Sequence, residues 1–150
     1  MTAGGSSLPE VQRLLSVLAA GRRCAETGTA FGEGAAAIAS TAASLVTVER
    51  DASRADAARE RLAAYDNVEF HVGDWRDVLP TRAPFGFLFF DAGRLDEAPE
   101  VVDLLEPGGL LVKDDLTPAE QSTAIRYASC SSIIRGSLPS RSSRPRRLPS

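Results

Sequence analysis

The 150-residue sequence has few of the residue types that organise small disulfide-rich or metal-binding proteins. It contains one histidine, one tryptophan and two cysteines, and the cysteines, Cys24 and Cys130, fit no metal-ligand spacing. We therefore expect free thiols. The sequence also lacks any apolar run of about 18 residues, and residues 1–10, MTAGGSSLPE, lack the basic segment and apolar core of a secretory signal. These absences argue against a membrane segment and lead us to expect a cytoplasmic protein.

Charge is unevenly distributed along the chain. The formal net charge is −3, but residues 121–150 contain six arginines and no acidic residue, which leaves −9 for residues 1–120. An acidic body is a poor surface for nucleic acid. The basic tail has no aromatic residue after Tyr127 that could stack on bases, so we expect no specific nucleic-acid partner.

Segments of strand and helix character alternate along the first 118 residues. Ser7 and Glu10 have the spacing of a capping box, which predicts the start of a first helix. Strands are predicted at 23–26, 44–49, 67–74, 85–91 and 107–115. Helical patterns lie between them, at 33–43, after residue 50 with one face made of Ala55, Ala58, Leu62 and Tyr65, at 75–79 as a short helix or turn, and at 97–106. This alternation predicts an α/β fold, a Rossmann-like, doubly wound and mostly parallel sheet of order 3-2-1-4-5.

The last part of the chain has a different composition. Residues 129–150 are dominated by serine, arginine and proline, with too few large apolar residues to offset the entropy of ordering. We therefore divide the chain into a domain at 1–128 and a basic tail at 129–150 that we expect to be disordered. The same bias is what a shifted reading frame of a GC-rich gene would encode.

Every predicted strand ends in a carboxylate, and these ends share one edge of a parallel sheet, where ligands of such folds bind. The residues are Glu26, Glu49, Asp74, Asp91, and the pair Asp114 and Asp115. Any one of them could simply cap the following helix. All together would repel one another, so the edge is predicted to bind a cation or a ligand rich in hydrogen-bond donors.

The glycine loop narrows the choice of ligand. Its pattern, Gly28-x-x-x-Gly32-x-Gly34, differs from the Gly-x-Gly-x-x-Gly that binds a pyrophosphate, and Glu26 and Glu33 beside it would repel one. A nicotinamide-dependent oxidoreductase is therefore disfavoured, although it remains an alternative. A cofactor with an amine, a ribose and an adenine but no phosphate fits better, because Glu49 can accept from ribose hydroxyls. S-adenosylmethionine is such a molecule.

Five motifs occur in a characteristic order between about Leu8 and Pro118: AETGTAFGEG, VTVERD, VGDWRDVLP, FGFLFFDAG and LLEPGGLLVKDDLTP. This order resembles the class I S-adenosylmethionine-dependent methyltransferases, and within them the small O-methyltransferases of the catechol and caffeoyl-CoA type. The resemblance implies an enzyme that methylates a hydroxyl of a small acceptor. The cofactor-binding residues that it implies, together with the strand ends, are Glu26, Gly28, Thr29, Gly32, Gly34, Glu49, Asp74, Trp75 and Asp91. Trp75 could equally be a core residue.

The resemblance also implies a metal site. In the metal-dependent members of this family, acids that end the fourth and fifth strands bind a divalent ion, which corresponds here to Asp91, Asp114 and Asp115. Ligation by oxygen alone selects Mg²⁺, with Ca²⁺ or Mn²⁺ as substitutes. The alternative is that Asp114 and Asp115 only cap a following helix.

Two departures from the family limit what it implies. The catechol type has a lysine shortly after the fourth strand, where this chain has Arg94, so no catalytic base is predicted. Neither Lys113 nor His71 lies where a base is expected, and His71 is predicted to occupy a packed or edge position. The family's final antiparallel strands are also predicted to be absent or altered, which would leave an exposed sheet edge. The alternative function is therefore a non-catalytic, cofactor-binding remnant that forms a homodimer through that edge.

Overall fold

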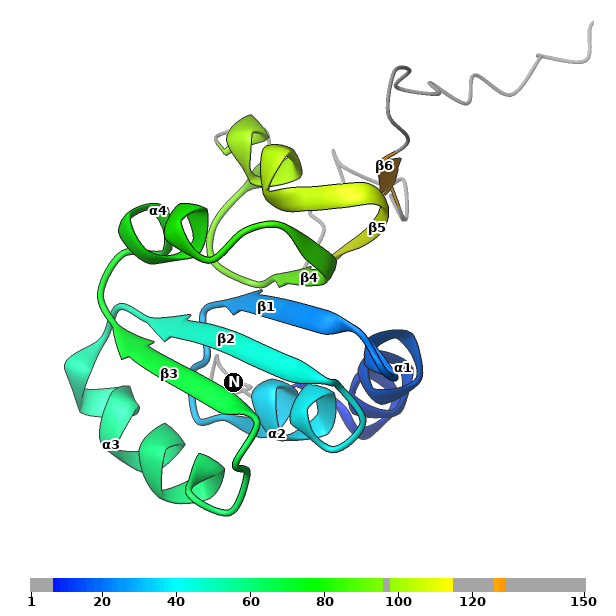
Figure 1. The fold of residues 1–150 in the computed structure, drawn as a ribbon. Helices are drawn as coiled ribbons and strands as arrows, with labels where there is room; N and C mark the ends of the chain where they lie inside the picture. The colour runs from blue at the N-terminus through cyan, green and yellow to red at the C-terminus, as the bar shows by residue number, and fades with distance from the viewer. Residues whose placement is uncertain (1–6, 96–97, 115–125, 129–150) are drawn as a thin grey trace, which may run out of the picture.

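The computed structural model describes residues 7–95, 98–114 and 126–128, which build one sheet of six strands in the order β3-β2-β1-β4-β5-β6 (Figure 1). The first five strands are parallel, so the predicted α/β fold and the order 3-2-1-4-5 are confirmed. Their bounds are β1 (Arg23–Thr27), β2 (Ser44–Glu49), β3 (Val68–Val72), β4 (Phe85–Phe90) and β5 (Leu105–Lys113). A short strand β6 (Arg126–Ala128) pairs antiparallel with β5. The final antiparallel strands were predicted to be absent or altered, and among the described residues β6, with three residues, is the antiparallel strand that is present. Residues 129–150, the predicted tail, lie outside the described residues.

Helices cover both faces of the sheet. The α-helices are α1 (Pro9–Ala19), α2 (Glu33–Ala39), α3 (Ala52–Leu62) and α4 (Trp75–Val78), and the 3-10 segments are η1 (Leu79–Thr81) and η3 (Pro99–Leu104). Figure 1 shows α1, α2 and α3 on one side of the sheet and α4 on the other. No helix among the described residues is long and apolar enough to cross a membrane.

Strand β4 joins the two halves of the core. All six of its residues are buried, as its unbroken apolar sequence predicts for a central parallel strand. Because successive side chains point to opposite faces, Phe87 and Phe89 pack with α1 and α2, whereas Leu88 and Phe90 pack with α4 and η3. Each buried side chain of this size contributes about 1.5–3 kcal/mol, so β4 anchors both layers.

Two predicted helix boundaries are wrong for identifiable reasons. Leu8, not Ser7, is the N-cap of α1, and it makes no side-chain cap because a leucine side chain has no hydrogen-bond acceptor. The carbonyl of Ser7 accepts a hydrogen bond from the Gln12 side chain. Helix α2 ends at Ala39 rather than residue 43. There the Asn67 amide donates to the carbonyls of Ala39 and Ala42, which satisfies the helix end from outside.

The segment before β5 also differs from the prediction. Residues 97–106 were expected to form a helix, but the described part is the 3-10 segment η3, and β5 already begins at Leu105. Leu105 pairs with Phe85 before an irregularity in the register. Gly108, with φ of 82°, lies in this irregular stretch, so the turn that the Pro-Gly-Gly sequence predicts lies within the strand. The cysteine prediction holds for Cys24, which is a buried free thiol, and Cys130 lies outside the described residues.

Candidate cofactor pocket

A pocket of about 390 Å³ lies at the carboxyl edge of the sheet, where the chain order reverses between β1 and β4. Ligands of open α/β sheets bind at this place. The pocket is built from the loops that follow β1, β2, β3 and β4. Its lining consists of Gly28, Ala30, Val48, Glu49, Arg50, Arg54, Gly73, Asp74, Trp75, Arg76, Asp91, Ala92 and Gly93.

Glu49, the last residue of β2, is the most firmly held acid of the pocket. Its side chain accepts a hydrogen bond from the backbone N–H of Ala30 at 2.6 Å and another from that of Asp51 at 2.7 Å. Only 5% of the residue is exposed. The two N–H groups, one from the glycine loop and one from the start of α3, therefore fix the carboxylate in a single orientation within the lining.

The glycines of the loop have two different roles. Gly28 has φ of 82°, and a Cβ there would come within 3.3 Å of the backbone nitrogen of Ala92, so the loop passes close to the end of β4 within the pocket wall. Gly32, with φ of 87°, is the N-cap of α2. A Cβ at Gly32 would meet Arg61 and Ala58 of α3, so this glycine allows two helices to approach and does not face the pocket.

Arg61 ties the same loop to α3. Its guanidinium forms an ion pair with Glu33 at 2.8 Å and donates to the carbonyl of Phe31 at 2.9 Å. Glu33, which was expected to repel a pyrophosphate, is thus neutralised by Arg61. No spacing in the sequence could have revealed this pair, because the two residues belong to different helices.

Glu26 lies beneath the loop instead of in the pocket lining. It is 1% exposed and accepts a hydrogen bond from the Thr47 hydroxyl at 2.6 Å. Burial raises the pKa of Glu26 to about 8, with the Thr47 hydrogen bond opposing the shift and the charges of Asp91 and Glu49 adding to it. Gly34 makes room for this carboxyl group, since a Cβ there would lie 2.7 Å from its Oε1 atom.

The segment after β3 closes the pocket on a third side. Asp74 caps α4, because its Oδ1 accepts from the N–H of Arg76 at 3.0 Å. Trp75 is 6% exposed, packs edge-on against Phe90 at a centroid distance of 5.9 Å, and still lines the pocket. Arg76 stacks over the Trp75 ring at 4.6 Å and pairs with Glu100 at 2.8 Å. The two alternatives for Trp75, core residue and pocket wall, therefore both hold.

Residues 25–116, more than half of the chain, match the family described as the methyltransferase domain. The chain belongs to this methyltransferase family. It is 35% identical over 97 residues to a protein-L-isoaspartate O-methyltransferase of Brucella anthropi, a match that covers 63% of this chain and 45% of that protein. The methyltransferase domain thus spans about half the length of the curated relatives it matches.

Solved structures give the same family. The O-methyltransferase TomG from Streptomyces achromogenes, in complex with S-adenosylmethionine, matches with a TM-score of 0.68 and 32% identity over 75% of this chain and 58% of that one. An O-methyltransferase from Bacillus cereus, in complex with S-adenosylhomocysteine, matches with a TM-score of 0.66 and 26% identity, over 75% and 59% of the two chains. The predicted methyltransferase family is confirmed. Its catechol type stays a prediction, because the relatives include the isoaspartate type.

Five of the nine predicted cofactor residues meet in the pocket of this methyltransferase domain: Gly28, Glu49, Asp74, Trp75 and Asp91. The other four, Glu26, Thr29, Gly32 and Gly34, lie outside its lining. The arginines of the lining, Arg50, Arg54 and Arg76, were not predicted. Arg50 directly follows Glu49, whereas Arg54 and Arg76 lie in the first turns of α3 and α4. This nearness to predicted acids is the only sign of their place that the sequence offered.

The predicted metal site is described only in part. The pairing of Phe90 with Lys113 places Asp91 and Asp114 at the ends of neighbouring strands, which is the arrangement expected from the sequence. Asp115 lies outside the described residues. Among residues 7–95, 98–114 and 126–128 no group of three His, Cys, Asp or Glu side chains is arranged to hold a metal ion.

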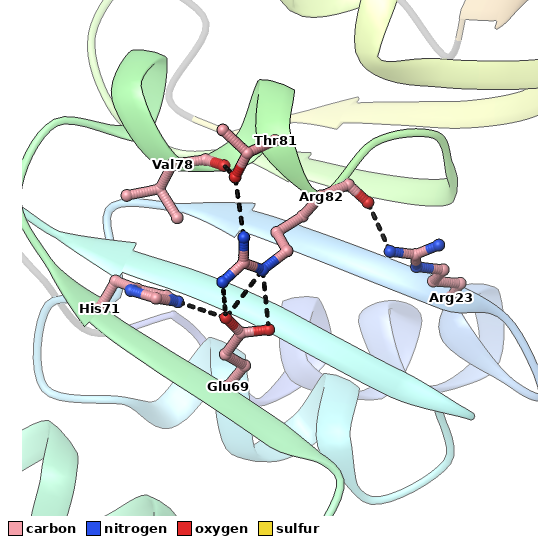
Figure 2. A network of polar contacts seen from close by, with 6 residues as sticks. All are labelled: Arg23, Glu69, His71, Val78, Thr81 and Arg82. Atoms are coloured by element: carbon pink, nitrogen blue, oxygen red, sulfur yellow. Dashed lines mark hydrogen bonds and ion pairs between the residues drawn. The ribbon is translucent and has the colours of Figure 1, made fainter.

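His71 lies away from the pocket, on the edge strand β3, as predicted (Figure 2). The Glu69 carboxylate accepts from Arg82 at 2.9 Å and is 2.7 Å from the His71 ring. These hydrogen bonds, first from Arg82 and then from His71, lower the pKa of Glu69. Figure 2 shows the Arg82 side chain reaching across to β3, so this network braces the sheet and takes no part in the pocket.

Proposed function

We propose that this chain binds S-adenosylmethionine in the pocket and transfers its methyl group to an oxygen atom of an acceptor. The observation that carries the proposal is the fixed carboxylate of Glu49. A carboxylate offers about four acceptor positions, and the N–H groups of Ala30 and Asp51 use two of them. The remaining positions suit the two neighbouring hydroxyls of a ribose.

The rest of the lining fits the same cofactor. The volume of about 390 Å³ lies within the range of about 300–1,000 Å³ that is usual for small-molecule pockets. Trp75 supplies an aromatic wall beside Asp74, where an adenine would lie. Asp91 and Glu49 place two carboxylates in the lining, which suit the ammonium and sulfonium groups of this cofactor.

The chemistry of the bound cofactor is the donation of an electrophilic methyl group from its sulfonium to a nucleophile. The chain's own residues hold and orient the reactants: Glu49 fixes the ribose end, the Gly28 backbone forms the wall beside β4, and Asp91 lies at the end of that strand. Positioning of this kind accounts for a large part of the rate of a two-substrate reaction.

An isoaspartyl carboxylate is the acceptor that we favour. The relatives at 35% and 36% identity are named protein-L-isoaspartate O-methyltransferases. A carboxylate is already ionised at neutral pH and needs no general base, and the described lining contains neither lysine nor histidine. Arg50 and Arg54 also belong to the lining, and a guanidinium group can bind an anionic acceptor; the Arg54 guanidinium lies 3.7 Å from the Asp51 carboxylate.

A small hydroxylated molecule is the second candidate, favoured by the similarity to TomG. A hydroxyl would have to lose its proton, and a divalent ion held by Asp91, Asp114 and Asp115 would lower its pKa. This candidate therefore depends on the metal site, whereas the isoaspartyl acceptor does not.

Calorimetric titration with S-adenosylhomocysteine tests the cofactor, with Glu49→Ala as the pocket variant and Glu60→Ala, an exposed glutamate of α3, as the matched control. We expect micromolar binding that Glu49→Ala loses and Glu60→Ala keeps. Transfer of labelled methyl groups to an isoaspartyl peptide, to its aspartyl isomer and to a catechol, each with Mg²⁺ or with a chelator, then separates the acceptors. Metal-independent labelling of the isoaspartyl peptide alone is the expected result. Binding without transfer to any acceptor would favour the non-catalytic alternative.

A further inference from the structure

A chain of three buried polar side chains runs from β1 through β2 into the glycine loop. The Thr47 hydroxyl donates to Glu26 Oε2 at 2.6 Å, and the oxygens of Thr29 and Thr47 are 2.6 Å apart. Either of the two threonine hydroxyls can be the donor of the bond between them, and Thr29 is the donor where the Thr47 proton goes to Glu26. The exposed fractions are 1% for Glu26, 0% for Thr47 and 3% for Thr29. All three side chains are therefore shielded from water.

This series of hydrogen-bonded side chains ends next to Ala30, a residue of the pocket lining. The residue after Thr29 is Ala30, whose N–H donates to Glu49 at 2.6 Å. The N–H groups of Gly28 and Thr29 both donate hydrogen bonds to the carbonyl of Val48, at 2.9 and 3.3 Å. Ala30 itself has φ of 49°, a conformation that a residue with a side chain adopts only when its surroundings hold it there.

We propose that Thr47, acting through Thr29, is a positioning residue for the cofactor pocket: it holds the loop so that the Ala30 N–H orients the Glu49 carboxylate. The inference rests on the proposed cofactor site. Thr47 and Glu26 lie opposite each other in the register of β1 and β2, so the anchor belongs to the rigid sheet. Neither Thr47 nor Thr29 belongs to the pocket lining. Because these hydrogen bonds already order the loop, binding of the cofactor costs less conformational entropy, which strengthens the affinity.

A purely structural role would have a different signature. Polar groups buried in a core stabilise the fold when they are satisfied, and their loss lowers stability without changing the affinity of a pocket that still forms. A positioning role changes the affinity for the cofactor in the folded protein.

The experiment measures S-adenosylhomocysteine affinity for the full chain at a temperature where each variant is folded. Thr29→Val removes the donor at the loop end and leaves the bond from Thr47 to Glu26 intact, so this variant is expected to fold even if Thr47→Val does not. Thr29→Ser and Thr47→Ser keep the hydroxyls. Thr41→Val is the matched control, because the Thr41 hydroxyl donates to the Ser16 carbonyl away from the pocket. The free energy of unfolding of each variant is measured beside its affinity, so that a loss of stability and a loss of affinity are told apart.

Thr29→Val and Thr47→Val should weaken binding about tenfold, the scale of one hydrogen bond. The serine variants and Thr41→Val should stay within about twofold of the parent. Wild-type affinity in folded Thr29→Val would overturn the inference, and so would a loss of stability in Thr29→Val and Thr47→Val with no change in affinity. A wild-type chain that does not bind the compound would instead refute the proposed function.

Discussion

The buried carboxyl of Glu26 should make the stability of this protein depend on pH in a way that one substitution removes. Burial raises its pKa to about 8, from 4.5 for an ordinary glutamate. The folded protein therefore binds a proton at Glu26 more tightly than the unfolded chain does. The stability from this group is fully present below about pH 4.5 and is lost as pH rises through about 8. The slope reaches about 1.4 kcal/mol per pH unit and flattens near both pKa values, so about 3 kcal/mol is lost between pH 5 and pH 8.

Glu26→Gln keeps the shape of the side chain and an acceptor for Thr47, but it cannot ionise. We expect the free energy of unfolding of Glu26→Gln, minus that of the wild type, to rise by about 3 kcal/mol from pH 5 to pH 8. Urea unfolding at four pH values, followed by the fluorescence of Trp75, measures this difference. All other titrating groups are common to both proteins and largely cancel. Glu60→Gln, on the exposed face of α3, should give a flat difference.

A constant difference between Glu26→Gln and the wild type across this pH range would refute the reasoning. It would mean that Glu26 ionises in the folded protein near its ordinary pKa. A pH-independent offset of either sign would not matter, because the buried amide of the glutamine contributes equally at every pH. The slope, not the offset, carries the test.

Three further substitutions test other parts of the site. Gly28→Ala should destabilise the protein by about 1 kcal/mol more than Gly21→Ala. Both glycines have positive φ, but only Gly28 has backbone atoms within 3.4 Å of the added Cβ. Urea unfolding of both variants measures the difference in stability, and equal losses would contradict the crowding at Gly28. Trp75 is the single tryptophan and lines the pocket, so its fluorescence should change on titration with S-adenosylhomocysteine. Trp75→Ala should cost about 3–5 kcal/mol of unfolding free energy, and a loss below about 1 kcal/mol would show that it is not a core anchor. Arg61→Ala removes a pair with Glu33 and a bond to Phe31 and should cost about 1–2 kcal/mol, whereas Arg13→Ala, on the exposed side of α1, should cost less than about 0.5 kcal/mol in the same thermal melts.

Much of the fold could be predicted because its signals are local. The apolar run of β4 and the bounds of β2, 44–49, follow directly from residue type, and the alternation of elements gives the parallel order. The end of β2 also marks Glu49, since any acid there lies at the ligand edge of the sheet. Boundaries failed where distant groups decide them. The Asn67 amide, from another segment, donates to the carbonyls at the end of α2, and no pattern within 33–43 contains that information.

The place of Glu26 shows why the site could be only partly predicted. A residue near the end of a strand can turn toward the ligand edge or toward one face of the sheet, and the sequence pattern of β1 does not distinguish them. In the structure Glu26 lies beside Thr47 in the register and opposite the space that Gly34 leaves open, so it is covered by α2. Gly34, which the loop pattern assigned to the cofactor, therefore makes room for the Glu26 carboxyl group. Glu26 in turn contacts the loop through Thr47 and Thr29. Both residues contribute to the pocket through the contacts beneath it, which is why a motif can mark them correctly as a group while misplacing each one.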